Sequence, residues 1–137
     1  MSDPRPDPAA LLAALPYAGF LGMTARWEGD AVVGVLPFAA PLVGNTFLPA
    51  LHGGVLGAFM ELTALIQLGL SEPTRRQPRT IDVTVEYLRP GLARATYARA
   101  DVRKVGRRIA NVHVEAWQDD PATPVAALRG HFMLGEA

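Results

Sequence analysis

The chain of 137 residues contains no cysteine, which excludes both a disulfide framework and a zinc site built from thiolates. Net charge is also missing, because 13 lysine and arginine residues balance 13 aspartate and glutamate residues. Without an excess of one sign, bulk electrostatics gives no reason to expect a nucleic acid or a membrane surface as a partner. We therefore expect a cytoplasmic protein whose ligand is recognised by local features.

Charged residues are absent from positions 31–60, a stretch long enough to suggest a membrane span. Pro37, Pro41 and Pro49 divide it into pieces that are too short to cross a bilayer. The first eight residues also lack the basic and apolar pattern of a signal peptide. The length predicts a single domain over residues 1–137, with residues 1–7 flexible.

The order of apolar and polar residues predicts a short helix, two strands, a long helix and four further strands. The short helix is expected over residues 8–15, with Asp7 as N-cap and a stop at Pro16, and a loop over residues 38–50. The long helix and the strands are expected over residues 51–70 and over 23–28, 31–37, 80–88, 93–105, 108–118 and 125–134. Short links between strands favour antiparallel pairing, so we predict an α+β fold in which one antiparallel sheet wraps around the long helix.

The predicted long helix is almost wholly apolar, and one carboxylate, Glu61, interrupts it. Burying a carboxylate without a partner costs several kcal/mol, so its position needs a reason. A helical wheel gives Glu61 a face of small residues, Gly54, Gly57 and Ala58, with Thr63 and Gln67 on the opposite side. Such a face leaves room for a ligand. Alternatively, the small residues only permit tight packing and Glu61 pairs with an arginine.

Two glycines, Gly53 and Gly54, mark the start of the predicted long helix. The first N–H groups of a helix lack intrahelical acceptors, and the helix dipole adds positive potential there, so this end can polarise a carbonyl. Glu61 lies about 10–12 Å further along the helix axis at 1.5 Å per residue. The two features can therefore act on one substrate only between two copies of the chain.

Three segments together resemble hotdog-fold acyl-CoA thioesterases, closest to the PaaI-like and 4-hydroxybenzoyl-CoA thioesterase-related group. The first is Leu51-His52-Gly53-Gly54, with a carboxylate nine positions after the histidine. The second is the predicted strand from Thr80 to Leu88, which ends in a Tyr-Leu-Arg-Pro sequence. The third is the turn Lys104-Val105-Gly106-Arg107. The resemblance covers roughly residues 19–134.

This resemblance implies a hotdog fold and a homodimer whose two sheets join, often paired again as a dimer of dimers. It implies hydrolysis of a small or medium acyl-CoA, with an aryl or a short- to medium-chain acyl group, to the free acid and coenzyme A, without a metal or cofactor. By motif match, the Gly54 amide would hold the thioester carbonyl, and Glu61 of the partner chain would act as general base or nucleophile. Asn45 would match an upstream asparagine of the family, and Thr80 a hydroxyl residue that helps position water.

Two residues depart from the pattern of the PaaI-like group. That group usually has aspartate where this chain has Glu61, although other hotdog thioesterases use glutamate on this helix. The extra methylene leaves the roles of nucleophile and general base open. Asn45 stands seven residues before His52, one more than the pattern has.

The remaining candidate residues each have two interpretations. Lys104, Arg107 and Arg108, with Arg103, flank Gly106 and would suit the phosphates of coenzyme A or form a solvated strand end. The same two interpretations hold for Arg89. His52 either bonds a ligand or braces the loop before the helix. Gly53 is expected to bind substrate, because a glycine there lets a substrate approach the backbone without meeting a side chain.

Two other functions remain open for the same residues. In a hotdog-type enoyl-CoA hydratase or dehydratase, His52 and Glu61 would move protons on the acyl chain. A non-catalytic acyl-CoA-binding protein would bind the thioester without releasing coenzyme A.

Overall fold

The computed structural model of the chain describes residues 3–45, 47, 50–73 and 77–135. Its helices are α1 (Pro8–Ala13), α2 (Pro16–Leu21) and α3 (Gly53–Ser71), with a short 3₁₀ helix η1 (Ala40–Leu42). Its strands are β1 (Thr24–Glu28), β2 (Ala31–Leu36), β3 (Val43–Asn45), β4 (Ala50–Leu51), β5 (Arg79–Tyr87), β6 (Thr96–Val105), β7 (Ile109–Trp117) and β8 (Ala126–Met133).

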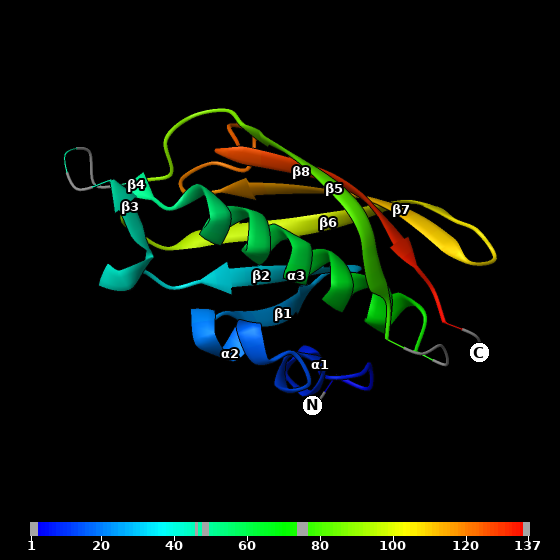
Figure 1. The fold of residues 1–137 in the computed structure, drawn as a ribbon. Helices are drawn as coiled ribbons and strands as arrows, with labels where there is room; N and C mark the ends of the chain where they lie inside the picture. Colours follow the sequence, from blue (N-terminus) through cyan, green and yellow to red (C-terminus); the bar gives the residue numbers. More distant parts are fainter. Residues whose placement is uncertain (1–2, 46, 48–49, 74–76, 136–137) are drawn as a thin grey trace.

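Six of the strands form one antiparallel sheet in the order β1-β2-β6-β7-β8-β5. The sheet curves around α3, while α1 and α2 lie beside β1 (Figure 1). β5, the strand that directly follows α3, forms one edge of the sheet. The α+β prediction, an antiparallel sheet around one long helix, is confirmed.

The core lies between α3 and the concave face of the sheet. Phe59 and Met60 of α3 are fully buried, as is Phe132 of β8. α3 is long and apolar enough to cross a membrane by length and composition alone, but burial within the sheet accounts for its apolar sequence. This helix is therefore the core of the domain.

Two polar residues, Gln67 and Thr63, lie on the far side of α3 against β2, and Gln67 bonds this strand. The buried Gln67 side chain accepts a hydrogen bond of 2.9 Å from the Val32 backbone N–H. The Thr63 hydroxyl donates to the Phe59 carbonyl, and it would lie 2.7 Å from a Cβ atom at Gly34. Fixing this side against the sheet leaves the opposite side, which carries Glu61, partly open.

The structure differs from the predictions in three segments. The short helix α1 ends before Pro16, as predicted, but Pro16 then begins a second helix, α2, that was not predicted, because proline suits the first position of a helix. The predicted loop over residues 38–50 contains η1, β3 and part of a small β3–β4 hairpin. The strand expected from residue 93 begins at Thr96. Elements this short depend on tertiary contacts, such as the hydrogen bond from the Leu51 N–H to the Gly91 carbonyl.

Part of the N-terminal segment packs against the β1–β2 hairpin. The Arg5 guanidinium lies 4.1 Å from the centre of the Trp27 ring, and the Trp27 indole N–H donates to the Pro6 carbonyl. Arg5 also donates hydrogen bonds to the Asp3 carboxylate, which lowers the pKa of this acid.

Candidate active site

Glu61 lies in the middle of α3, half-buried, and faces the first residues of β5. The Thr80 hydroxyl donates a hydrogen bond of 2.7 Å to Glu61 Oε2. Among the described residues, the other carboxylate oxygen has no hydrogen-bond partner and Glu61 has no cation within ion-pair distance. The alternative in which an arginine neutralises Glu61 therefore finds no support in this part of the chain. One hydroxyl orients the carboxylate and leaves an oxygen free to accept a proton.

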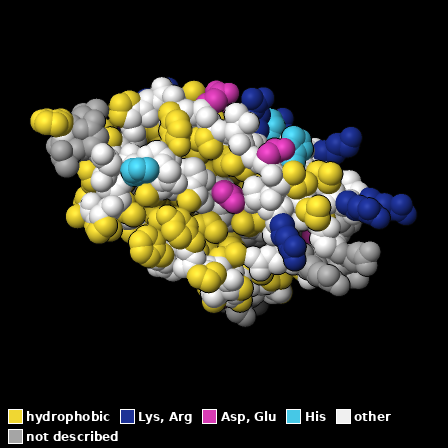
Figure 2. Space-filling model, viewed as in Figure 1, with side chains coloured by type: hydrophobic (Ala, Val, Ile, Leu, Met, Phe, Trp, Pro, Cys, Tyr) yellow, Lys and Arg dark blue, Asp and Glu magenta, His cyan; other side chains and the backbone are white. Residues whose placement is uncertain are grey.

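The surface around Glu61 is apolar and lined by small residues. Gly54 is exposed, while Gly57 and Ala58 are partly exposed. This side of α3 faces the edge strand β5, and a Cβ atom at Gly57 would lie 3.7 Å from the Val85 and Tyr87 side chains. Hydrophobic side chains gather along α3 and over α2, with few charged groups among them (Figure 2). The small residues thus share the side of α3 that carries Glu61, as the helical wheel predicts.

The N-terminus of α3 begins at Gly53, as the two glycines predict, and His52 is its N-cap. His52 Nδ1 accepts a hydrogen bond of 2.9 Å from the Gly54 N–H. The imidazole must therefore be unprotonated at Nδ1. Of the two interpretations of His52, the structure shows the bracing one, and it shows that the amide expected to hold a substrate carbonyl already has an acceptor. A carbonyl would have to replace the imidazole at this N–H.

The role of His52 as N-cap predicts the stability of its variants. Replacing His52 by alanine should lower the free energy of unfolding by about 1 kcal/mol, because the Gly54 N–H loses its acceptor. Replacing it by asparagine, a strong N-cap residue, should retain most of that stability. Urea unfolding of the three proteins measures the difference. Equal losses in both variants would contradict the capping role.

Tyr87 at the end of β5 is a site residue that the sequence reasoning missed. Its hydroxyl donates a hydrogen bond of 2.7 Å to the Gly53 carbonyl, and its ring would be 3.2 Å from a Cβ atom at Gly53. The alternation along β5 contains the signal, because it places Tyr87 on the same face of the strand as Val83 and Val85. A side chain at position 53 would therefore require this ring to move by a few tenths of an ångström.

A surface cavity of about 320 Å³ opens beside the same helix end. Gly53, Tyr87, Arg89 and Pro90 are among the residues that line it. Arg89 is exposed and has no carboxylate partner among the described residues. The structure thus brings the predicted Arg89 to the N-terminus of α3.

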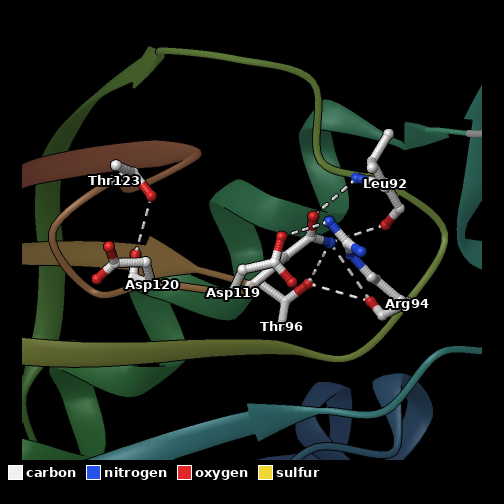
Figure 3. Close-up of polar contacts among 7 residues, drawn as sticks. Leu92, Arg94, Thr96, Asp119, Asp120 and Thr123 are labelled. Atoms are coloured by element: carbon white, nitrogen blue, oxygen red, sulfur yellow. Dashed lines mark hydrogen bonds and ion pairs between the residues drawn. The ribbon is translucent and has the colours of Figure 1, made fainter.

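A second cavity of about 340 Å³ shares Arg89 and Pro90 and extends between the β5–β6 and β7–β8 connections. Its walls are held by an ion pair of 2.7 Å between Arg94 and Asp119, whose side chains point toward each other (Figure 3). The Gln118 side chain bonds both the N–H and the carbonyl of Leu92. These contacts fix the two connections, so Arg89 stands at the edge of a preformed surface.

Two groups of predicted residues lie elsewhere or outside the described part. Asn45 ends β3, and its side chain is not among the described parts of the chain. Lys104, Arg107 and Arg108 lie at the β6–β7 turn, at the opposite end of α3 from Gly53 (Figure 1). Within one chain, the structure does not bring this turn to the helix N-terminus. Its neighbour Arg103 forms an ion pair of 2.7 Å with Asp101.

Metal ligands do not gather in the described part of the chain, where no three His, Asp or Glu residues are placed to hold an ion. His131 does contact an acid, Asp82, at 2.9 Å, but on the outer face of the sheet, away from α3. The chemistry that the described site offers is therefore that of a carboxylate, a hydroxyl and a helix N-terminus.

Comparison with known proteins places this geometry in a family. The family model of the thioesterase superfamily matches residues 48–125, which include α3, β5, β6 and β7. The medium/long-chain acyl-CoA thioesterase YigI of Escherichia coli K12 is 28% identical over 135 residues, which cover 88% of this chain and 86% of YigI.

Solved structures share the fold over most of their length. A crystal structure of a Chromobacterium violaceum protein is 37% identical, with a TM-score of 0.74 over 91% of this chain and 87% of that one. The PaaI protein of the E. coli phenylacetic acid degradation operon is 21% identical, with a TM-score of 0.78 over 91% and 88%. The chain therefore belongs to the thioesterase superfamily, as a thioester hydrolase with the hotdog fold.

Proposed function

We propose that this chain is an acyl-CoA thioesterase that works as a homodimer, with each active site shared between two copies. The observation that carries the proposal is the Glu61 carboxylate, which is oriented by Thr80 and open toward a face of small residues. The name of YigI, an acyl-CoA thioesterase, supports the class of substrate.

The distance along α3 requires two copies. Gly54 and Glu61 are seven residues apart, about 10 Å along the axis, so they cannot act on the same carbonyl within one helix. The partly open face of α3 lies beside β5, an edge strand of nine residues whose outer side pairs with no other strand in the described part of the chain. Unpaired edges and apolar faces are both surfaces that chains bury by association. Two antiparallel copies of α3 would place Glu61 of one chain opposite Gly54 of the other.

In this dimer the reaction needs only groups that the chain supplies, together with water. The thioester carbonyl replaces His52 as acceptor of the Gly54 N–H, which stabilises the oxyanion of the tetrahedral intermediate. Glu61 of the partner takes a proton from water as the water oxygen bonds to the carbonyl carbon. The carbon–sulfur bond then breaks, and the thiolate leaves as coenzyme A and takes up a proton. Alternatively, Glu61 attacks the carbonyl carbon itself. Neither route calls for a metal or cofactor.

The acyl group would bind along the apolar surface beside α3. Phe59 and Met60 are completely buried in the core, so they cannot line an open channel. Tyr17 and Phe20 of α2 instead stack at 5.5 Å and remain 48% and 77% exposed. YigI is named for medium and long acyl chains, and the family resemblance of the sequence implies small or medium ones. Medium-chain acyl-CoA is the substrate class common to both, so we expect it for this chain.

The phosphates of coenzyme A would be bound by cations near the helix N-terminus. Arg89 already lines the cavity beside Gly53. Antiparallel packing of α3 would also bring the partner's β6–β7 turn, with Lys104, Arg107 and Arg108, to that end of the helix. A dimer of dimers and a cytoplasmic location remain predictions of the same proposal.

The test is release of free thiol from aryl, short-, medium- and long-chain acyl-CoA substrates by the purified chain. Hydrolysis of at least one class, strongest for medium chains, is the expected result. Hydration of an enoyl-CoA without thiol release would favour the hydratase. Saturable binding in calorimetry without any turnover would favour the binding protein, and either outcome would overturn the proposal.

A further inference from the structure

The hydrogen bond between Thr80 and Glu61 depends on an irregularity in β5. The polar and apolar residues alternate strictly along this strand, which would place Thr80 on the outer face with Asp82 and Thr84. In the structure, however, Thr80 pairs with the buried Phe132 while Asp82 pairs with His131, so Ile81 is an extra residue. This bulge turns Thr80 toward α3 and Glu61.

The bulge runs against the hydrophobic pattern. In a regular ladder, Ile81 would oppose Phe132 and be buried, and Thr80 would oppose Met133 on the exposed face. The structure instead leaves Ile81 45% exposed and places a hydroxyl against the core side. Apolar burial therefore favours the register that removes Thr80 from Glu61. Other contacts must hold the bulge in place.

Two such contacts come from the facing strand β8. A Cβ atom at Gly130 would lie 3.0 Å from the Asp82 carbonyl oxygen and 2.9 Å from the Phe132 ring, so only glycine permits this close approach beside the bulge. On the outer face, His131 Nδ1 lies 2.9 Å from Asp82 Oδ1. His131 Nε2 in turn lies 3.1 Å from Asn111 Nδ2 of β7.

We propose that Gly130, His131 and Asp82 are positioning residues, which hold the bulge at Ile81 and so direct the Thr80 hydroxyl at Glu61. The proposal rests on the proposed function, because it gives the bulge a role in orienting the carboxylate that does the chemistry. In the tautomer protonated at Nδ1, His131 donates to Asp82 and accepts from Asn111, which connects the bulge to two neighbouring strands. The pair is about half exposed, so it adds little to global stability, and its effect is on register.

The test compares His131→Phe with His113→Phe, its matched control on the outer face of β7. His131→Phe should lower kcat about tenfold with KM nearly unchanged, because Thr80 loses its orientation. His113→Phe should leave kcat unchanged, since no described contact links it to β5. In a Thr80→Val background, His131→Phe should have no further effect on kcat, because it acts only through Thr80.

Deleting Ile81 provides a second test of the proposal, one that does not depend on the His131→Phe substitution alone. Without this residue, Thr80 and Asp82 would still oppose Phe132 and His131, now in a regular ladder. The deletion variant should therefore retain its kcat, and His131→Phe in this background should not lower kcat.

Equal losses of kcat from His131→Phe in the wild-type and Thr80→Val backgrounds would overturn the proposal. Wild-type kcat in His131→Phe, beside an inactive Glu61→Gln, would overturn only the positioning role. An active Glu61→Gln would overturn the proposed function first.

Discussion

Replacing Glu61 by glutamine should lower kcat for thioester hydrolysis by a factor of about 10²–10⁴, the range that a positioned general base contributes. Glutamine keeps the size of the side chain and an oxygen that can accept from Thr80, so the fold should persist. What it loses is the ability to take a proton from water or to attack a carbonyl. The measurement is thiol release at saturating acyl-CoA, with the melting temperature as a check of folding.

The matched control for this substitution is Glu86→Gln. Glu86 is another glutamate, but it lies on β5, the strand that follows α3. It is exposed and belongs to the polar outer face of that strand. Its replacement should leave kcat within about twofold, the effect usual for a surface charge far from the chemistry. Comparable losses in both variants would mean that carboxylate charge in general, and not Glu61, supports the activity.

A Glu61→Asp variant addresses the choice that the extra methylene leaves open. Aspartate withdraws the carboxylate by one bond, which an intervening water can bridge but a direct attack cannot. Partial activity would therefore favour the general base, and complete loss would favour the nucleophile. Incorporation of heavy oxygen from solvent into the Glu61 carboxylate would establish the covalent route directly.

The sequence predicts the parts of the site that follow from periodicity. The face of Gly54, Gly57 and Ala58 around Glu61 is a consequence of 3.6 residues per turn, so the order of residues alone specifies it. The core helix and the antiparallel sheet follow in the same way. The helical wheel also puts Gln67 on the far side of the helix, where the structure has it bonded to Val32.

The parts that periodicity does not predict depend on contacts between distant segments. The role of His52 as N-cap requires the rotamer of one side chain, which no pattern specifies. Strict alternation predicts the wrong face for Thr80, because the bulge at Ile81 arises from the packing of β5 on β8. Resemblance to a family, and not periodicity, predicts that Thr80 belongs to the site. Local rules thus fail where the structure orients the carboxylate, which is where functional sites commonly depart from them.

Mixing two inactive variants should restore activity if each site combines residues of two chains. Gly54→Val would put a branched side chain in front of the N–H that is proposed to hold the carbonyl, since even a Cβ atom there lies 3.0 Å from His52 Nδ1. Glu61→Gln removes the proposed base. In a mixed dimer, one site contains both substitutions and the other contains neither. Random reassociation should therefore give about a quarter of the wild-type activity, because half of the dimers are mixed and half of their sites are intact.

The control for this experiment mixes Glu61→Gln with the double variant Glu61→Gln, Gly54→Val. Every site then lacks the carboxylate, so no activity should appear, although the same number of mixed dimers forms. A site contained within one chain predicts the opposite pattern: neither mixture would exceed its parents, because each chain carries a defect. Mass spectrometry of the intact dimers would show that mixing has occurred. Recovery in the first mixture alone would therefore mean that α3 supplies its amide to one site and its carboxylate to another.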